Sequence, residues 1–210
     1  GMPSDPTQTQ VMASLINQKA PAFTAPAVMP DGTTKEISLS DYAGKYVALV
    51  FYPKDFTFVC PSELIALDHK CAELADKNTV ILGVSMDDAE THAKWRETAI
   101  NDGGIGALQY ALIADDAKKV SEAYDVVHEA SGFSYRATFL IDKDGVVQSA
   151  THNNLPLGRS MDELVRMVDA LQFHEENGEV CPANWQPGKA GMQATAEGVK
   201  SYLQEHASSL

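Results

Sequence analysis

A cysteine stands between two prolines at the point where an apolar stretch of the chain ends. Residues 46–52 form the continuous apolar run YVALVFY, and the segment PKDFTFVCPSE follows directly, with Cys60 near its end. A cysteine that serves only packing fits better inside an apolar run than just after one. We therefore interpret Cys60 as a candidate nucleophile.

The start of a helix can make Cys60 reactive. A thiol reacts as its thiolate, so a reactive cysteine needs surroundings that stabilise the negative charge. Pro61 suits the first position of a helix, where its missing N–H is not needed, and Cys60 would then be the N-cap residue. Its sulfur would face the N–H groups of Ser62 and Glu63 at the positive end of the helix dipole.

Pro53 and Thr57 frame this cysteine. A proline ends the hydrogen bonding of a strand, so we expect Pro53 to shape the loop back toward the sulfur. Thr57 offers a hydroxyl that can bond the thiolate or a bound oxygen. Average residue usage puts the pattern Pro-x-x-x-Thr-x-x-Cys in a random chain of this length on the order of once in a hundred. The alternative is a buried cysteine at a helix start that does no chemistry.

The elements that must position these residues follow from the apolar pattern. Continuous apolar runs predict buried strands, and apolar residues three or four apart predict helices. The expected strands are 23–28 at an edge of the sheet, 46–52, 79–85, 109–113, 137–142 and 146–150, the last after a turn at Asp144-Gly145. The expected helices are 61–77, 88–101, 115–124 and 160–173, the last with a capping box from Ser160 to Glu163. This alternation predicts an α/β fold with a mixed central sheet flanked by helices.

The chain changes character after about residue 174. Residues 175–192 are rich in Pro, Gly and Asn, yet they include Cys181 and Trp185. A segment with little regular structure cannot bury a tryptophan by itself, so it must dock on the domain or on another subunit. We therefore expect one domain over residues 1–174, loose over its first 20 residues, and a C-terminal extension over residues 175–210.

Composition limits the partners. The 210 residues are 44% hydrophobic and carry a formal net charge of −13, which argues against nucleic acid and an anionic membrane surface. No apolar run approaches the ~18 residues of a membrane span. The start, GMPSDPTQTQ, lacks the pattern of a signal peptide, so we expect a cytoplasmic protein. The six histidines show no zinc-like spacing with the cysteines, so we expect them at the surface or in local hydrogen bonds, with no metal and no cofactor.

Residues 52–63, YPKDFTFVCPSE, resemble the active-site motif of the peroxiredoxins. The resemblance runs from INQKAPAF at residues 16–23 to EVCPANW at residues 179–185. The second segment is similar to the resolving-cysteine segment of the typical two-cysteine class, which includes thioredoxin peroxidases and the C subunit of alkyl hydroperoxide reductase. The resemblance implies a thioredoxin-like fold, in agreement with the predicted order of strands and helices.

The resemblance implies a thiol-dependent peroxidase for hydrogen peroxide and small organic hydroperoxides. Cys60 would be the peroxidatic nucleophile, whose thiolate attacks one peroxide oxygen and becomes a sulfenic acid. Pro53 would shield the sulfur from bulk water, and Thr57 would bond the peroxide oxygen. These roles agree with the positions that the residues alone suggest.

The resemblance also implies a set of charged residues around the sulfur. Arg136, in SYRATFLID at residues 134–142, matches the catalytic arginine of the family. A guanidinium there would stabilise the negative charge that grows on the leaving oxygen. Glu63 and Arg159 match charged positions that help to hold this arginine. The alternative is that Glu63 and Arg159 form an ion pair with only a structural role.

A sulfenic acid must be captured by a second thiol, and Cys71 and Cys181 are the candidates. Cys71 would lie in the helix that Cys60 opens, ~16 Å away at ~1.5 Å per residue. A disulfide needs Cα atoms within ~7 Å, so we expect Cys71 to pack in the core and Cys181 to resolve. The residues leave open whether Cys181 comes from the same chain.

The resemblance implies that the resolving cysteine comes from the partner subunit. It therefore implies a homodimer, a ring of such dimers, and re-reduction by thioredoxin or by a dedicated flavoprotein disulfide reductase. A thioredoxin-like reductase is a rival interpretation, but it would need a Cys-x-x-Cys pair, which the sequence lacks. A non-enzymatic holdase role, known for ringed members of the family, is an alternative that no residue pattern here indicates.

Two segments resemble elements that make some peroxiredoxins sensitive to over-oxidation. Residues 103–106, GGIG, match a Gly-Gly-Leu-Gly loop with Ile for Leu, and Tyr202-Leu203 resembles a Tyr-Phe pair with Leu for Phe. Leucine lacks the contact area of the ring, so we expect a weaker clamp over the active site and intermediate sensitivity. The alternative is an ordinary glycine turn and an apolar contact on a terminal helix.

Overall fold

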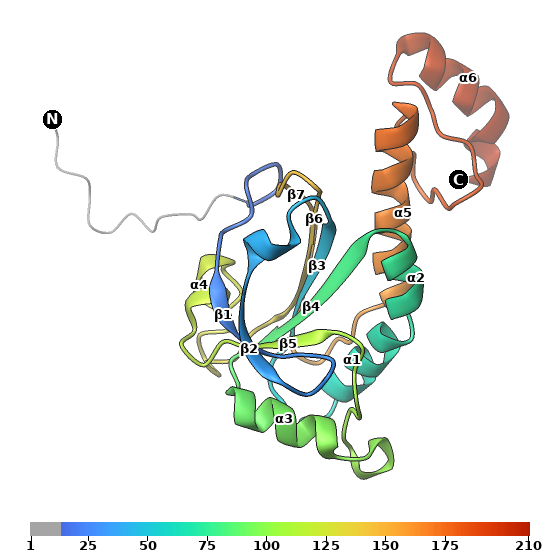
Figure 1. Ribbon diagram of the computed structural model, residues 1–210. Coiled ribbons are helices and arrows are strands. Elements are labelled where there is room, and N and C mark those ends of the chain that lie inside the picture. Colours follow the sequence, from blue (N-terminus) through green and yellow to red (C-terminus); the bar gives the residue numbers. More distant parts are fainter. Residues whose placement is uncertain (1–13) are drawn as a thin grey trace, which may run out of the picture.

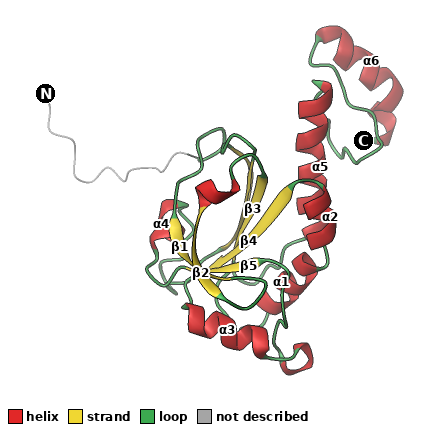
Figure 2. Cartoon of the chain, in the orientation of Figure 1, coloured by secondary structure: helices red, strands yellow, loops and turns green. Residues whose placement is uncertain are grey.

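The computed structural model of the protein describes residues 14–210, and the expectation of a loose start without a signal peptide lies largely outside them. The strands are β1 (Thr24–Val28), β2 (Thr34–Ser38), β3 (Tyr46–Phe51), β4 (Thr79–Ser85), β5 (Ala111–Ala114), β6 (Arg136–Ile141) and β7 (Val147–Asn153). The helices are α1 (Cys60–Asp68), α2 (Cys71–Asp76), α3 (Ala89–Glu97), α4 (Lys119–Ala123), α5 (Met161–Asn177) and α6 (Ala196–His206). Figures 1 and 2 show their arrangement.

All seven strands belong to one sheet, in the order β2-β1-β5-β4-β3-β6-β7. β3, β4 and β5 run parallel to one another, and the remaining strands pair antiparallel with their neighbours. Every residue of β3 and β6 is buried, as continuous apolar runs at the centre of a sheet predict. The predicted α/β fold with a mixed central sheet is confirmed.

The predicted strand over residues 23–28 is confirmed as β1, but its predicted place at the edge of the sheet is wrong, because β2 pairs with the outer side of β1 and is itself the edge. A turn through Gly32, whose φ is 86°, folds the chain back to make this pair. Only Ile37 of β2 is buried. The segment TKEIS is therefore too polar for its apolar pattern to predict a strand.

The predicted helix over residues 61–77 is broken into α1 and α2. The break follows Asp68, whose carboxylate accepts a hydrogen bond of 2.7 Å from the backbone N–H of Gln109, on the chain before β5. The straight-helix distance between Cys60 and Cys71 is therefore not valid as derived. Cys71 does pack against the apolar cluster under α1, as expected, and its thiol lies 3.8 Å from the carbonyl oxygen of Gln109.

Two apolar clusters fill the two faces of the sheet. One joins α1, α2, α3 and α5 to the sheet and includes Leu64, Trp95 and Val168. The other places Val120 of α4 and Tyr124 against the opposite face. Figure 1 shows α1, α2 and α5 on one side of the sheet and α4 on the other. The layers are therefore helix, sheet and helix, as predicted.

α5 is longer than predicted and continues to Asn177, past the expected domain boundary at residue 174. Ser160 is its N-cap, and the hydroxyl of Ser160 accepts a hydrogen bond from the N–H of Glu163. Gly178 is its C-cap, with a φ of 69°, the left-handed value that favours glycine at a helix end. The division of the chain at residue 174 stays a prediction.

The C-terminal extension packs along one stripe of α5. The ring of Trp185 lies 4.9 Å from that of Phe173 between centroids, and Trp185 is buried. The guanidinium of Arg166 donates to the Trp185 carbonyl oxygen at 3.0 Å, and the Cys181 thiol donates to that of Ala170 at 3.3 Å. The expected docking of Trp185 is thus made within one chain.

Residues 178–195 form no helix or strand, as predicted for most of the 175–192 segment, and α6 follows them. Thr195 caps α6 by accepting a hydrogen bond from the N–H of Gly198. None of the residues of α6 is buried, and Figure 1 shows α6 standing away from the sheet. Across residues 14–210 no helix combines the length and apolar character of a membrane span.

Candidate active site

Cys60 lies at the start of α1, just after the loop that leaves β3, and its side chain is fully buried. Its predicted place as N-cap is off by one residue, because Val59 is the N-cap and Pro61 follows Cys60 inside the first turn. The N–H of Glu63 donates to the Val59 carbonyl oxygen at 3.3 Å and not to the sulfur. Among the described residues, the one hydrogen bond to the sulfur comes from Arg136.

Arg136 is the first residue of β6, and pairing of β6 with β3 brings it to the end of the strand that leads to Cys60. Its Nη1 lies 3.4 Å from the Sγ of Cys60 and donates to Oε1 of Glu63 at 2.6 Å. Its Nε donates to the carbonyl oxygen of Leu155 at 2.7 Å. The guanidinium is therefore held from two sides and directed at the sulfur.

Glu63 connects this arginine to a second one. Its Oε2 accepts hydrogen bonds from the Nε of Arg159 at 2.6 Å and from the backbone N–H of Arg159 at 2.9 Å. Burial raises the pKa of the Glu63 carboxyl, but the hydrogen bonds and charge of Arg159, together with the charge of Arg136, outweigh it and hold the pKa below its ordinary value. Glu63 is thus a buried carboxylate between two guanidinium groups.

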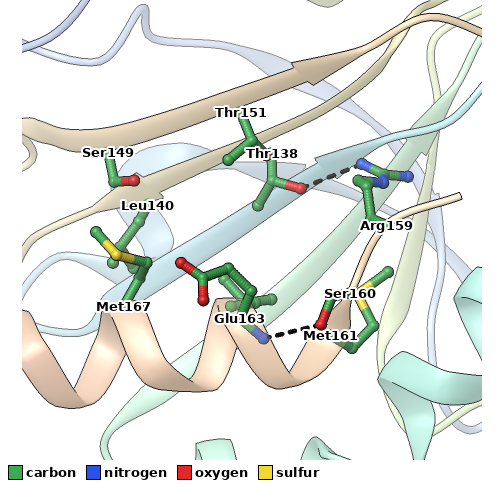
Figure 3. A pocket seen from close by; sticks show the side chains of 10 residues that line it. Thr138, Leu140, Ser149, Thr151, Arg159, Ser160, Met161, Glu163 and Met167 are labelled. Atoms are coloured by element: carbon green, nitrogen blue, oxygen red, sulfur yellow. Dashed lines mark hydrogen bonds between the residues drawn. The ribbon is translucent and has the colours of Figure 1, made fainter. Parts of the chain in front are cut away.

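Arg159 also fixes the loop before α5 to the sheet. Its Nη1 donates to the Ala137 carbonyl oxygen at 2.8 Å and to the hydroxyl of Thr138 at 3.1 Å, the bond drawn in Figure 3. Beside it lies a small cavity of about 40 Å³ between α5 and the β6–β7 pair, lined also by Met161 and Met167. Its residues do not include Cys60, so it lies behind the charged cluster and not at the sulfur.

Pro53 and Thr57 lie on the loop between β3 and α1, as predicted. Pro53 is buried, and the hydroxyl of Thr57 donates to the Lys54 carbonyl oxygen at 2.6 Å. Its oxygen keeps acceptor capacity. Phe58, two residues before Cys60, is 98% exposed, so the loop carries a large apolar ring into solvent directly beside a buried sulfur.

A second polar cluster, which no sequence pattern indicates, lies under this loop. Asp55 accepts hydrogen bonds from the hydroxyl of Tyr52 at 2.6 Å and from Nδ1 of His92 at 2.5 Å. Both side chains of the Asp55–His92 pair are fully buried. The expectation that every histidine is at the surface or locally bonded is wrong for His92, whose partner is 37 residues away. The only sequence signal was the place of Asp55 between Pro53 and Thr57.

Asp55, His92 and Asp87 each offer a ligand atom, all within 4.8 Å of one another, as a metal site would require. Hydrogen bonds already occupy these atoms. Nε2 of His92 lies 2.9 Å from the Ile113 carbonyl oxygen, and Oδ2 of Asp87 accepts from Ser85 and from the N–H of Asp55. The cluster is therefore satisfied as a hydrogen-bond network.

Cys181 follows α5 in the chain and packs back against it, where its thiol donates to the carbonyl oxygen of Ala170, and it is not paired with Cys60. Burial raises the pKa of the Cys181 thiol above its ordinary value, and the positive charge of Arg166 only partly opposes this. All three cysteines are free thiols. One chain thus brings together Cys60, Arg136, Glu63 and Arg159, and it holds the predicted resolving cysteine apart from them.

This geometry suits attack by a thiolate on a small electrophile. A cation lies against the sulfur, and a buried carboxylate fixes that cation in place, so little reorganisation is needed when charge moves away from the sulfur. A profile of the AhpC/TSA family matches residues 16–150 of the chain. The chain belongs to this family of peroxiredoxins. A profile of the C-terminal domain of 1-Cys peroxiredoxin matches residues 170–205.

Individual peroxiredoxins match almost the whole chain. Peroxiredoxin-2 of Bos taurus is 47% identical over 191 residues, which cover 91% of this chain and 96% of that protein. The mitochondrial thioredoxin-dependent peroxide reductase of Drosophila melanogaster is 44% identical over 202 residues, or 95% of this chain and 86% of that protein.

Solved structures confirm the class. The reduced 2-Cys peroxiredoxin of Plasmodium vivax is similar with a TM-score of 0.89 and 46% identity, covering 91% of this chain and all of that one. Enterococcus faecalis AhpC matches with a TM-score of 0.75 and 36% identity over 81% of this chain and 100% of that one. This peroxiredoxin is therefore a peroxidase of the two-cysteine type with a thioredoxin-like fold, as predicted.

Proposed function

We propose that this peroxiredoxin reduces hydrogen peroxide and small organic hydroperoxides through a sulfenic acid on Cys60. The observation that carries the proposal is the contact of 3.4 Å between the buried sulfur of Cys60 and the guanidinium of Arg136. The thiolate bonds to one peroxide oxygen, the O–O bond breaks, and the other oxygen leaves as hydroxide or alkoxide and takes a proton. Arg136 stabilises the charge that grows on this leaving oxygen.

The supporting residues follow from the same geometry. Glu63 and Arg159 hold Arg136 in the orientation that faces the sulfur. Thr57, on the loop before Cys60, offers a hydroxyl oxygen to the peroxide, and the buried Pro53 limits the access of water. The ion pair is thus proposed to be part of the catalytic site and not only of the fold.

We further propose that Cys181 of the partner subunit resolves the sulfenic acid. Its thiolate attacks the Cys60 sulfur, the S–O bond breaks, and the oxygen leaves as water once protonated, which produces an intersubunit disulfide. Thioredoxin or a dedicated flavoprotein reductase then returns both thiols. The name of the similar Drosophila protein, thioredoxin-dependent peroxide reductase, supports thioredoxin. We also propose a cytoplasmic setting, in which cellular reductants keep such thiols reduced between turnovers.

Steady-state peroxide consumption tests the proposal with thioredoxin or a flavoprotein disulfide reductase as the electron source. The wild type, Cys60→Ser and Cys181→Ser are compared with each reductant. We expect turnover by the wild type with one reductant, no peroxide reduction by Cys60→Ser, and a single turnover by Cys181→Ser. Fast peroxide reduction by Cys60→Ser would show that another group is the nucleophile. Sustained turnover by Cys181→Ser would remove Cys181 from the cycle.

A further inference from the structure

Four segments of the chain converge beneath the loop that carries Thr57 and leads to Cys60. Tyr52 comes from the end of β3, His92 from α3 and the Ile113 carbonyl from β5, and all of them lie around Asp55 or its histidine partner. The N–H of Asp55 donates to Asp87, which also accepts from Ser85 at the end of β4. The loop is therefore fixed at Asp55 through both its side chain and its backbone.

The hydrogen-bond partners of His92 define its proton content. Nδ1 faces the carboxylate of Asp55 and Nε2 faces the carbonyl oxygen of Ile113, and both partners are acceptors. Each ring nitrogen must donate, so His92 carries both ring protons and pairs as an imidazolium with the Asp55 carboxylate. A buried charged pair is costly unless it is fully hydrogen-bonded. The Asp55–His92 pair is fully hydrogen-bonded, which indicates that its role is to fix the geometry of the loop.

The residue after Asp55 has a strained backbone. Phe56 has a φ of 57°, a left-handed value that is unfavourable for a bulky residue. Its ring lies 5.9 Å from that of Trp95 between centroids, but half of the side chain is exposed, so packing alone does not hold it. Such strain persists where the surroundings over-determine the conformation. Here the fixed point is the network around Asp55.

We propose that Asp55 is a positioning residue of the peroxidase reaction, held by His92 and Tyr52 so that the left-handed turn at Phe56 delivers Thr57 and Cys60 to the site. The inference rests on the proposed role of Cys60. It adds that the fixed end of the loop is at Asp55, so that the part of the chain after it can open and reclose on a defined geometry. Asp55 does not touch the sulfur and acts through the backbone of residues 56–60.

The test is the second-order rate constant for reduction of hydrogen peroxide by reduced protein, measured by stopped-flow, together with the melting temperature. Displacing a reacting group by ~1 Å costs about 100-fold in rate, so Asp55→Ala is expected to lose about that factor. Asp55→Asn can donate to a neutral His92 and still accept from Tyr52, so it should recover to within about tenfold of the wild type.

Asp115→Ala is the matched control. Asp115 is also a buried loop carboxylate, which accepts hydrogen bonds from the N–H and hydroxyl of Ser121, but it lies outside the loop before Cys60. It should lower the melting temperature and leave the rate constant within about threefold of wild type, a difference well under the ~1.4 kcal/mol of a tenfold change. Tyr52→Phe, which removes one hydroxyl, should slow the reaction several-fold even if Asp55→Ala fails to fold.

Three outcomes would overturn the inference: a wild-type rate constant in Asp55→Ala, an equal loss of rate in Asp115→Ala, or an unchanged rate in Tyr52→Phe when Asp55→Ala does not fold. Failure of the proposed function would appear differently. In that case wild-type protein itself would show no reduction of peroxide that depends on Cys60.

Discussion

At the scale of the residue, Arg136 binds three partners with one side chain. Its Nη1 faces the Cys60 sulfur and Glu63, and its Nε faces the Leu155 carbonyl oxygen. A planar guanidinium can hold such divergent partners at once, whereas a lysine ammonium is a single point charge. The identity of this residue, and not only its charge, should therefore matter for the rate.

We predict that Arg136→Lys slows peroxide reduction by about 100- to 1,000-fold, the usual loss for one well-placed donor at a developing charge. Stopped-flow measurement of the second-order rate constant with hydrogen peroxide checks this, and circular dichroism serves as the control for folding. A rate constant within about threefold of the wild type would remove Arg136 from the site.

The ion pairs of Glu63 should make a pH-dependent contribution to the stability of the fold. The pKa of its carboxyl is held below the ordinary value in the folded protein, so the ion pairs stabilise the fold above the pKa of the unfolded chain, ~4.3. This stabilisation is lost as the pH falls through the folded pKa. Breaking a buried pair by removing one partner costs ~3–5 kcal/mol.

We therefore expect Glu63→Gln to lower the free energy of unfolding near pH 7, and the difference from wild type to shrink below pH ~4. Urea denaturation of both proteins at a series of pH values measures this difference. A difference that stays constant down to the acid limit would mean that Glu63 is not an ionised partner of the two arginines.

At the scale of the element, local patterns predicted most of the sheet but not its polar edge. β3 and β6 are continuous apolar runs, and they were predictable because burial on both faces leaves a strong signal. β2 and the break between α1 and α2 were not. β2 has a single buried residue and so carries no apolar pattern. The break lies beside Asp68, whose carboxylate bonds Gln109, 41 residues away, and no local pattern marks that contact.

The same division holds for the site. Cys60, Thr57 and Pro53 stand in one short motif, so their proximity is local. Asp55 and His92 pair across 37 residues, and no periodic pattern marks them as a pair. Arg136 was predictable only through the resemblance to peroxiredoxins, because its position at the first residue of β6 acquires meaning from the pairing of β6 with β3.

α6 gives a prediction about over-oxidation. In one chain, Figure 1 shows α6 far from α1, so a clamp over the first turn of α1 would have to act on another subunit. Removing the chain from residue 196 onward should let that turn open more readily and so shorten the life of the sulfenic acid. Titration of peroxide during turnover, with sulfinic Cys60 counted by mass spectrometry, should show less over-oxidation in the truncated protein. Equal inactivation of both proteins would rule out such a clamp.

At the scale of the whole molecule, β7 is an edge strand with no further strand on its outer side among residues 14–210. The backbone of Val147 already exchanges hydrogen bonds with Asn17 and Gln18 on this side, and the rest of β7 exposes a row of backbone donors and acceptors that a second copy can pair with. A homodimer formed there would supply the partner chain that the resolving step requires. The dimer and any larger ring stay predictions.

We predict that the oxidised protein runs as a disulfide-linked dimer that joins Cys60 of one chain to Cys181 of another. Non-reducing electrophoresis with peptide mapping measures this, and Cys71→Ser, which should still form the dimer, is the control. A monomer band that carries a Cys60–Cys71 disulfide would mean that α1 and α2 rearrange on oxidation and that Cys71 resolves.

Because Cys60 is completely buried, thiol reagents of different size should react with it at rates that depend on how far the loop opens. A reagent as small as a peroxide can reach the sulfur through slight fluctuations, whereas a bulky maleimide must wait until the first turn of α1 unfolds. The ratio of the two labelling rates would then report the free energy of that local opening in the native protein. Labelling of Cys60 would thus measure the local unfolding that disulfide formation with the resolving cysteine requires.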